Sequence, residues 1–232
     1  MTDLCIDRCA QLMNNLNMDF TQSVVIDTKT VDWQSSPSAG VYRKPLAREG
    51  RESGHATSIV KYSPGARFNR HEHPKGEEIF VLSGVFSDET GDFGPGHYFR
   101  NPAGTGHAPY SVGGCTLLVK LCQFQNGDNQ RVSISTQRSK WQPGQGALQV
   151  MPLHSFGTEH TALVKWPAGE RFKLHYHVGG EEIYVISGVL QDEFGSYGAG
   201  TWLRSPHMSQ HFPVVQEETI IWVKTGHLAL AD

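Results

Sequence analysis

The sequence predicts an all-β protein made of two similar small barrels with little helix. Two observations predict this class. A long internal repeat divides the 232 residues into halves, and each half consists of short apolar runs separated by Gly, Pro, Asp and Ser. The chain contains 25 Gly and 12 Pro and only 19% charged residues, a composition that suits a turn-rich β protein better than a helical or disordered one.

The repeat is clearest where His71–Val85 returns as His175–Val189, an offset of 104 residues (71 to 175). The same offset, without a gap, relates Gly65 to Gly169, Asp88-Glu89 to Asp192-Glu193, Arg100 to Arg204, Pro102 to Pro206 and His107 to His211. We therefore expect an N-terminal segment over residues 1–20, either disordered or helical, followed by one domain over residues 21–127 and a second over residues 128–232.

Strands are expected at the apolar runs of the first half, which are Ile59–Tyr62, Ile79–Leu82, Val85-Phe86, Tyr98-Phe99 and Thr116–Leu121. Ile79–Leu82 and its repeat Ile183–Ile186 are apolar at every position, as in strands that are covered on both faces. That covering favours a homo-oligomer, with a dimer as the simplest case. The helical candidate is Asp3–Leu16, with apolar residues at loosely helical spacing.

Charge and cysteine content exclude several classes of function. The net charge of −3 and the pI near 6.4 provide no basic surface for nucleic acid or for an anionic membrane. No run of about 18 apolar residues could span a bilayer, and residues 1–18 do not have the pattern of a signal peptide. The four cysteines are too few for a disulfide framework. We expect a cytoplasmic protein whose partners are small molecules or other proteins.

The residues that carry chemistry are three histidines and one glutamate in each half. His71 and His73 lie two apart, so on a strand they point to the same face, and Glu77 arrives from the next strand after the Pro74–Gly76 turn. His107 comes from a third strand. The second half repeats the set as His175, His177, Glu181 and His211. Three imidazoles and one carboxylate form a site for a first-row divalent metal, so we expect one ion per barrel, Zn first, with Fe, Mn, Ni, Co or Cu as alternatives.

The spacing G-x5-H-x-H-x3-E-x6-G from Gly65, followed by G-x5-P-x-G-x2-H from Gly96, resembles the two motifs of the cupin superfamily. The resemblance covers nearly the whole chain from about Val24 and implies double-stranded β-helix, or jelly-roll, barrels. Ser111 and Val215 stand where the family has Asn after the second motif, and Met208 replaces the turn glycine of the second copy. Glycine is used where the backbone needs positive φ, so this change puts the second turn in doubt.

A narrower resemblance, to the cupin domain of ChrR-type anti-sigma factors, rests on Val31–Trp33, Tyr42–Leu46, Glu77–Glu89, Tyr98–Pro102 and His107–Pro109. It implies a metal-binding regulatory or sensing protein linked to the response to reactive oxygen. Such proteins also carry a zinc-dependent helical domain that binds a sigma factor. Its His-x3-Cys-x2-Cys cluster is not found in the sequence, so sigma-factor binding by this chain is doubtful.

Two functions compete for these residues. The first is sensing or binding of a small ligand at the metal. The second is a non-haem metal-dependent dioxygenase acting on a small diketone, a phenolic ketone or a thiol, because three histidines and a glutamate leave about two octahedral positions free. No other catalytic constellation is recognisable, so any catalysis would depend on the metal.

Three further expectations concern neighbours of the ligands. Glu78 and Glu182 should turn away from the metal, toward Arg100 and Arg204 on neighbouring strands. Asp88-Glu89 and Asp192-Glu193 should be solvated hairpin residues. Met208, which is flexible and bulky, could fill space near the second site, so catalysis, if any, should belong to the first barrel.

Overall fold

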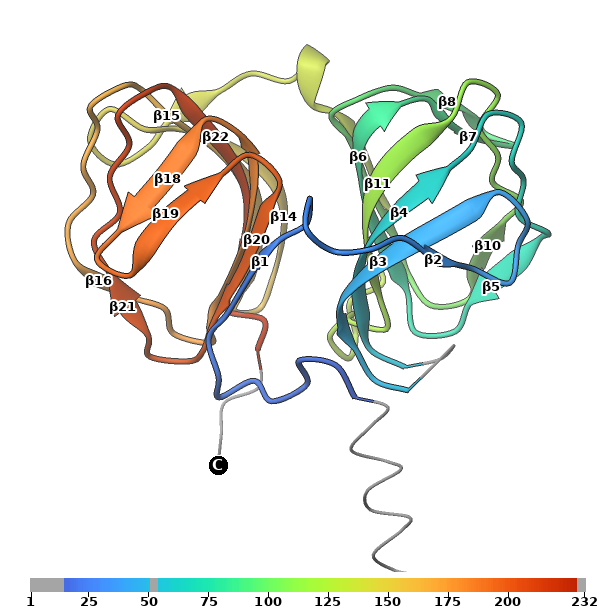
Figure 1. Ribbon diagram of the computed structural model, residues 1–232, viewed down its shortest axis with the longest axis horizontal. Helices are drawn as coiled ribbons and strands as arrows, with labels where there is room; N and C mark the ends of the chain where they lie inside the picture. The colour runs from blue at the N-terminus through green and yellow to red at the C-terminus, as the bar shows by residue number, and fades with distance from the viewer. Residues whose placement is uncertain (1–14, 51–53, 229–232) are drawn as a thin grey trace, which may run out of the picture. The chain divides into compact units, whose positions relative to one another are not determined.

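The computed structural model describes residues 15–50 and 54–228, which form two compact units. The first unit contains Asp32–Gln137 and the described part of Met1–Met18, and the second contains Asp19–Val31 and the described part of Arg138–Asp232. In each unit antiparallel strands curl into a barrel (Figure 1). The only helical element among the described residues is one 3-10 turn, η1 (Thr136–Arg138). The prediction of an all-β fold with little helix is confirmed.

The first barrel is built on a seven-stranded sheet in the order β12-β9-β6-β11-β4-β3-β2. These strands are β2 (Gln34–Ser35), β3 (Val41–Arg48), β4 (Ala56–Tyr62), β6 (Glu77–Gly84), β9 (His97–Asn101), β11 (Cys115–Leu121) and β12 (Val132–Ser135). Two short pairs complete it: β5 (His71–His73) with β10 (Thr105–His107), and β7 (Phe86–Asp88) with β8 (Gly91–Phe93).

The second barrel repeats this plan in the order β1-β20-β17-β22-β15-β14-β13. Its strands are β1 (Val24–Asp27), β13 (Gln142–Pro143), β14 (Gln149–Phe156), β15 (Glu159–Trp166), β17 (Glu181–Ser187), β20 (Thr201–Ser205) and β22 (Thr219–Thr225). The short pairs are β16 (His175–Tyr176) with β21 (Gln210–His211), and β18 (Val189–Asp192) with β19 (Gly195–Gly198).

The helical candidate Asp3–Leu16 lies almost entirely outside the described residues. The part that is described is not helical, since Leu16 forms an isolated antiparallel bridge with Arg48. The backbone amide of each of these two residues donates to the carbonyl of the other, at 2.8 Å in both directions. Residues 15–18 are thereby tied to the end of β3.

Each barrel takes one edge strand from the other half of the sequence. Strand β1 comes at the start of the first repeat but pairs with β20, so that Ile26 lies opposite Trp202. Strand β12 comes at the start of the second repeat but pairs with β9, so that Ile134 lies opposite Tyr98. Compared with the segments 21–127 and 128–232 of the repeat, the compact units have therefore exchanged their first strands.

The same local contacts hold both exchanged strands. The hydroxyl of Thr28 donates to the carbonyl of Gly200, and that of Thr136 donates to the carbonyl of Gly96, each at 2.7 Å. An aromatic ring precedes each strand and lies against an arginine, Phe20 on Arg204 in the second unit and Phe124 on Arg100 in the first. Equivalent contacts therefore hold the exchanged strand in both units.

The exchange predicts that a mutation in the first repeat destabilises the second barrel. Ile26→Ala removes side-chain volume from a half-buried position against Trp202, so we expect a loss of about 1–2 kcal/mol, less than the roughly 2–5 kcal/mol for a fully buried site. Amide hydrogen exchange should accelerate in β20 and stay unchanged in β9.

The matched control is Ile134→Ala, which occupies the equivalent place against Tyr98. It should accelerate exchange in β9 and leave β20 unchanged. If Ile26→Ala instead loosened β9 or both strands equally, the assignment of the edge strands would be wrong.

Candidate metal centres

The four expected ligands of the first barrel come from three neighbouring strands. His71 and His107 face each other across the β5–β10 pair, and His73 lies two residues further along β5. Glu77 begins β6 directly after a turn closed by Gly76, whose φ is +82°. A Cβ at Gly76 would lie 2.4 Å from the ring of Phe124, so this turn requires glycine.

These side chains converge on one point. The Nε2 atoms of His73 and His107 lie 3.2 Å and 3.5 Å from Glu77 Oε2. One ligand atom from each of the four residues can be chosen so that all lie within 4.8 Å of one another. Ligands about 2.0–2.2 Å from a common ion must lie this close, so the group could hold a metal ion.

The second barrel brings together His175, His177, Glu181 and His211 in the same way, again within 4.8 Å. His175 and His211 face each other across β16 and β21. The turn that was in doubt keeps its shape: Met208 adopts a φ of 60° and donates its amide to the carbonyl of His177 at 3.0 Å, as Gly104 does to His73 at 3.1 Å. The methionine accepts a backbone conformation that costs non-glycine residues about 1–2 kcal/mol, and its side chain is 51% exposed.

Hydrogen bonds fix the orientation of the rings in the first site. The Nδ1 atoms of His71, His73 and His107 lie 3.0, 3.2 and 3.3 Å from Asn69 O, Thr105 Oγ1 and Asp88 Oδ2. With Nδ1 engaged, each ring directs Nε2 toward the centre. An outer partner of this kind sets the tautomer of a metal-bound histidine.

Burial keeps two of the candidate ligand histidines neutral, which is the form that binds a metal ion. Desolvation lowers the pKa of His73 and lowers that of His177 to about 3, so both rings are neutral at pH 7 and can act as ligands. His73 Nε2 and Glu181 Oε2 are buried without a hydrogen-bond partner. In the second group, Nδ1 of His177 is the ring nitrogen that faces the glutamate, 3.5 Å from Glu181 Oε1. Burial, opposed by the charge of His211 and assisted by that of Asp192, raises the pKa of Glu181 to about 7. A bound divalent ion would satisfy these atoms, so the residues fit the expected metal.

The expectation that Asp88 and Asp192 are solvated is wrong. Asp88 is 9% exposed and accepts a hydrogen bond from His107, and Asp192 accepts one from His211 at 3.1 Å. Burial alone would raise the pKa of Asp88, but hydrogen bonds from His107 and Thr90 hold it at about 2. Each aspartate is therefore an ionised partner that orients one ligand ring. The repeat itself was the signal for this role, since each aspartate lies 19 residues before the third histidine of its group in the sequence.

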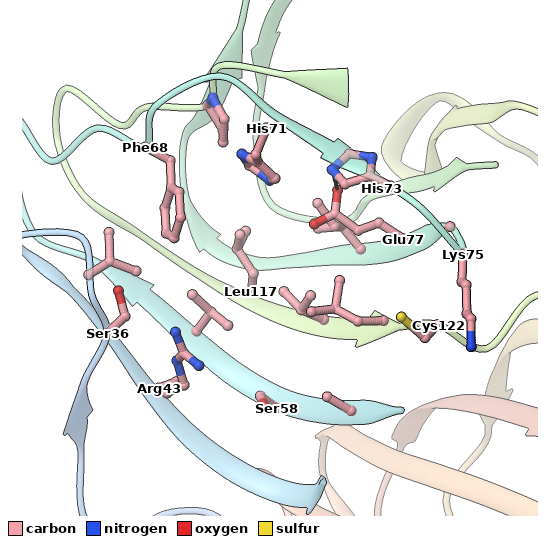
Figure 2. A pocket seen from close by; sticks show the side chains of 18 of the residues that line it. Ser36, Arg43, Ser58, Phe68, His71, His73, Lys75, Glu77, Leu117 and Cys122 are labelled. Carbon is pink, nitrogen blue, oxygen red and sulfur yellow. Dashed lines mark ion pairs between the residues drawn. The ribbon is translucent and has the colours of Figure 1, made fainter. Parts of the chain in front are cut away.

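A cavity of about 700 Å³ opens onto the first site. His71, His73 and Glu77 contribute to its lining (Figure 2), and so does His107. Most of the remaining surface is apolar and includes Phe68, Phe86 and Leu117. Arg43 and Ser58, which sequence reasoning had not singled out, lie on the cavity wall formed by β3 and β4.

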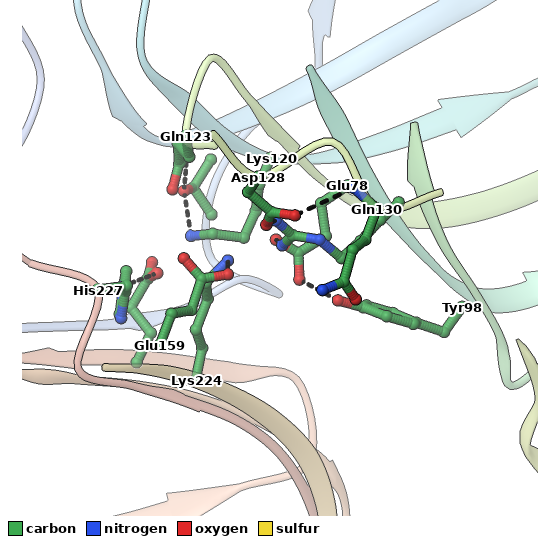
Figure 3. Close-up of polar contacts among 12 residues, drawn as sticks. Glu78, Tyr98, Lys120, Gln123, Asp128, Gln130, Glu159, Lys224 and His227 are labelled. Atoms are coloured by element: carbon green, nitrogen blue, oxygen red, sulfur yellow. Dashed lines mark hydrogen bonds and ion pairs between the residues drawn. The ribbon is translucent and has the colours of Figure 1, made fainter. Parts of the chain in front are cut away.

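Glu78 takes part in a buried polar network, not in the metal group (Figure 3). Glu182 is likewise buried among polar partners outside the second metal group. In the first unit, Arg100 donates to Glu78 at 3.2 Å and also to Asp128. This confirms the expected pair of Glu78 and Arg100. In the second unit, Arg204 lies opposite Glu182 in register; burial lowers the pKa of Arg204, and the charge of Glu182 opposes this effect. Arg204 also donates to the carbonyl of Asp19, while Glu182 accepts from Trp202 and pairs with His227 at 2.8 Å.

Comparison with known proteins identifies both repeats. The ChrR Cupin-like domain family matches residues 21–125 and 129–229. Among curated proteins, none matches the sequence. In the part of the chain that the structure describes, no helix is long and apolar enough to cross a membrane.

Several solved structures share the fold. A putative dioxygenase from Nostoc punctiforme has a TM-score of 0.76 at 15% identity, covering 88% of this chain and 82% of that one. The protein Ylba from E. coli has a TM-score of 0.70 at 12% identity, covering 97% and 99%. An oxalate decarboxylase from Bacillus subtilis, described with Mn(II) centres, has a TM-score of 0.62 at 17% identity, covering 97% and 84%. At these identities the likeness shows the fold alone.

The two sites should bind metal independently, because each set of ligands lies within one barrel. His73→Ala should reduce the metal content from about two ions per chain to about one, and the matched variant His177→Ala should do the same at the other site. Elemental analysis measures the total, and the double variant should contain none. Loss of both ions in either single variant would contradict independence.

Asp88→Asn should change the pH dependence of stability in the metal-free protein. The pKa of Asp88 lies below its ordinary 3.8. The stabilisation of the folded state by ionised Asp88 is therefore present above pH 3.8 and is lost as the pH falls through about 2. Burial lowers the pKa of His107, but Asp88 and Glu77 raise it above 6.5 overall. The stabilisation of the folded state by protonated His107 is therefore present below pH 6.5 and is lost as the pH rises through the pKa of His107 in the folded protein.

The difference in urea midpoint between the parent and Asp88→Asn should therefore be largest between about pH 4 and pH 6.5. Asp92→Asn is the control, because its carboxylate accepts a hydrogen bond from Ser87 instead of His107. A difference that does not vary with pH would show that Asp88 acts only through packing.

Proposed function

This chain belongs to the ChrR cupin-like family, and from that premise we propose that it binds a small organic molecule at a divalent metal ion in its first barrel, in a sensing or binding role. The observation that carries the proposal is the cavity of about 700 Å³ next to His71, His73, Glu77 and His107. Sites for small molecules usually combine such a volume with a mostly apolar lining and a few converging polar groups.

Each part of the first site has a task in this proposal. The three histidines and Glu77 would hold the ion, while Asp88 keeps the ring of His107 in place. Four protein ligands leave about two octahedral positions for other donors. A bound divalent ion supplies Lewis acidity to an oxygen or sulfur donor. Phe68, Phe86 and Leu117 exclude water around the organic part of the ligand.

The donor set does not select one metal. Neutral imidazoles and a carboxylate accept Zn, Fe, Mn, Co, Ni or Cu, and we propose Zn as the resident ion. The family resemblance also motivates a role in the response to reactive oxygen. In that role an oxidant, or a product of oxidation, would be the small molecule recognised in the cavity.

Metal-dependent dioxygenation is the second candidate. The observation in its favour is that the same cavity could admit dioxygen and a small diketone, phenolic ketone or thiol beside the metal ligands. A similar fold occurs in a protein described as a putative dioxygenase.

Binding should require the first site and not the second. Ligand-observed NMR with a mixed set of neutral, anionic and cationic small molecules should detect binders with the Zn-loaded parent and with His177→Ala. The same binders should be lost with His73→Ala. Binding that survives His73→Ala, or that disappears only with His177→Ala, would contradict the proposal.

Oxygen consumption tests the second candidate separately. The Fe(II)-loaded parent would consume oxygen with a diketone, a phenolic ketone or a thiol, and His73→Ala would abolish this consumption. Equal consumption by the parent and by His73→Ala would assign it to free iron and would contradict the enzymatic function.

A further inference from the structure

We propose that the ligand of the first barrel is an organic acid with an apolar body, whose carboxylate is recognised by Arg43 and Ser58. This inference rests on the proposed function and names the chemical class of its ligand. The metal would bind one part of the molecule, and the pair of polar side chains on the barrel wall would bind another.

Arg43 and Ser58 belong to neighbouring strands of the cavity wall. On β4, the alternate residues Ala56, Ser58, Val60 and Tyr62 line the cavity, as expected for one face of a strand. Arg43 pairs with Val60 across β3 and β4, so it lies on that same face. Figure 2 shows its guanidinium group directed into the space that Phe68 and His71 also face.

Ser58 provides an independent sign of a ligand. The residue is 5% exposed, and its Oγ atom is buried without a hydrogen-bond partner among the described residues. Leaving a buried hydroxyl unsatisfied costs about 1–3 kcal/mol relative to a bonded one. A ligand oxygen in the cavity would supply the missing partner.

The charged side chains on the cavity lining differ in their exposure to solvent. Glu49, Glu72 and Lys75 lie on its lining but are exposed to solvent, where their fields are screened. Apart from the metal ligand Glu77, the charged lining residues that are half-buried are Arg43 and Arg48. The planar guanidinium group of arginine matches a carboxylate with two parallel hydrogen bonds.

The second barrel keeps the metal ligands but not these groups. In the register of β14 and β15, Val150 pairs with Val164 where Arg43 pairs with Val60, and Ala162 pairs with Pro152 where Ser58 pairs with Pro45. Trp166 stands at the place of Tyr62 and packs into the core of its barrel. The same four residue types are thus assembled without an arginine or a serine at these two positions, so Arg43 and Ser58 are not needed to build the metal group.

The test compares acids with their uncharged derivatives. The probes are 3-phenylpropanoate and 2-oxo-3-phenylpropanoate, each with its methyl ester, titrated into the Zn-loaded protein by calorimetry. We expect the acids to bind the parent at least about tenfold more tightly than the esters. Arg43→Gln should remove that preference, and Ser58→Ala should weaken acid binding several-fold.

Controls separate recognition from folding and from metal loss. The exposed Arg171→Gln in the second barrel should leave acid binding unchanged. Zinc content and thermal midpoint are measured for every variant, and Arg43→Lys, which keeps the charge, should retain part of the preference if Arg43→Gln is poorly folded.

The outcomes distinguish the two proposals. If esters bind in a zinc-dependent way and acids bind no more tightly, or if the folded Arg43→Gln protein keeps the preference, the carboxylate site is wrong while the proposed function stands. If neither acids nor esters bind to the Zn-loaded parent, both proposals are contradicted.

Discussion

Gathering three histidines and a glutamate around one point, with two of the histidines and the glutamate buried, is the constraint on which the rest of each barrel depends. In the first barrel this arrangement requires a β5–β10 pair that sets His71 opposite His107, a glycine turn that delivers Glu77, and Asp88 to orient a ring. Without a cation the group leaves buried polar atoms unsatisfied, which is costly in an apolar interior. A bound divalent ion would offset that cost.

Much of the scaffold could be predicted from the sequence, because strands, turns and ligand spacing are local properties. The offset of 104 residues relates all four ligands of one barrel to those of the other. The exchange of strands was not predicted. Around β1 the repeat has another offset, since Ile26, Thr28 and Trp33 correspond to Ile134, Thr136 and Trp141, an offset of 108 (26 to 134). Long-range packing decides which sheet edge such a strand pairs with, and the periodicity of the sequence does not reveal it. Asp88 was misjudged for a related reason, since a hairpin residue is solvated by default and only the packing of β7 buries it.

The two repeats are alike in the residues of the candidate metal groups and differ in the residues of the surrounding barrel wall. Both keep the three histidines and the glutamate with their aspartate partners, and both keep the turn before the third histidine, even though Met208 takes a strained conformation there. They differ on the wall of the cavity, where Arg43 and Ser58 correspond to Val150 and Ala162. This difference supports the proposal that the first barrel recognises the ligand.

The central claim is that the four converging side chains of each barrel hold a metal ion. Anomalous diffraction from crystals of protein purified without added metals, collected on both sides of the absorption edge of each candidate element, tests it directly. The account predicts one peak in each barrel, about 2.0–2.2 Å from the histidine nitrogens and the glutamate oxygen. Absence of a peak from both groups after incubation with Zn, Fe or Mn, or a peak bound by other residues instead, would contradict it.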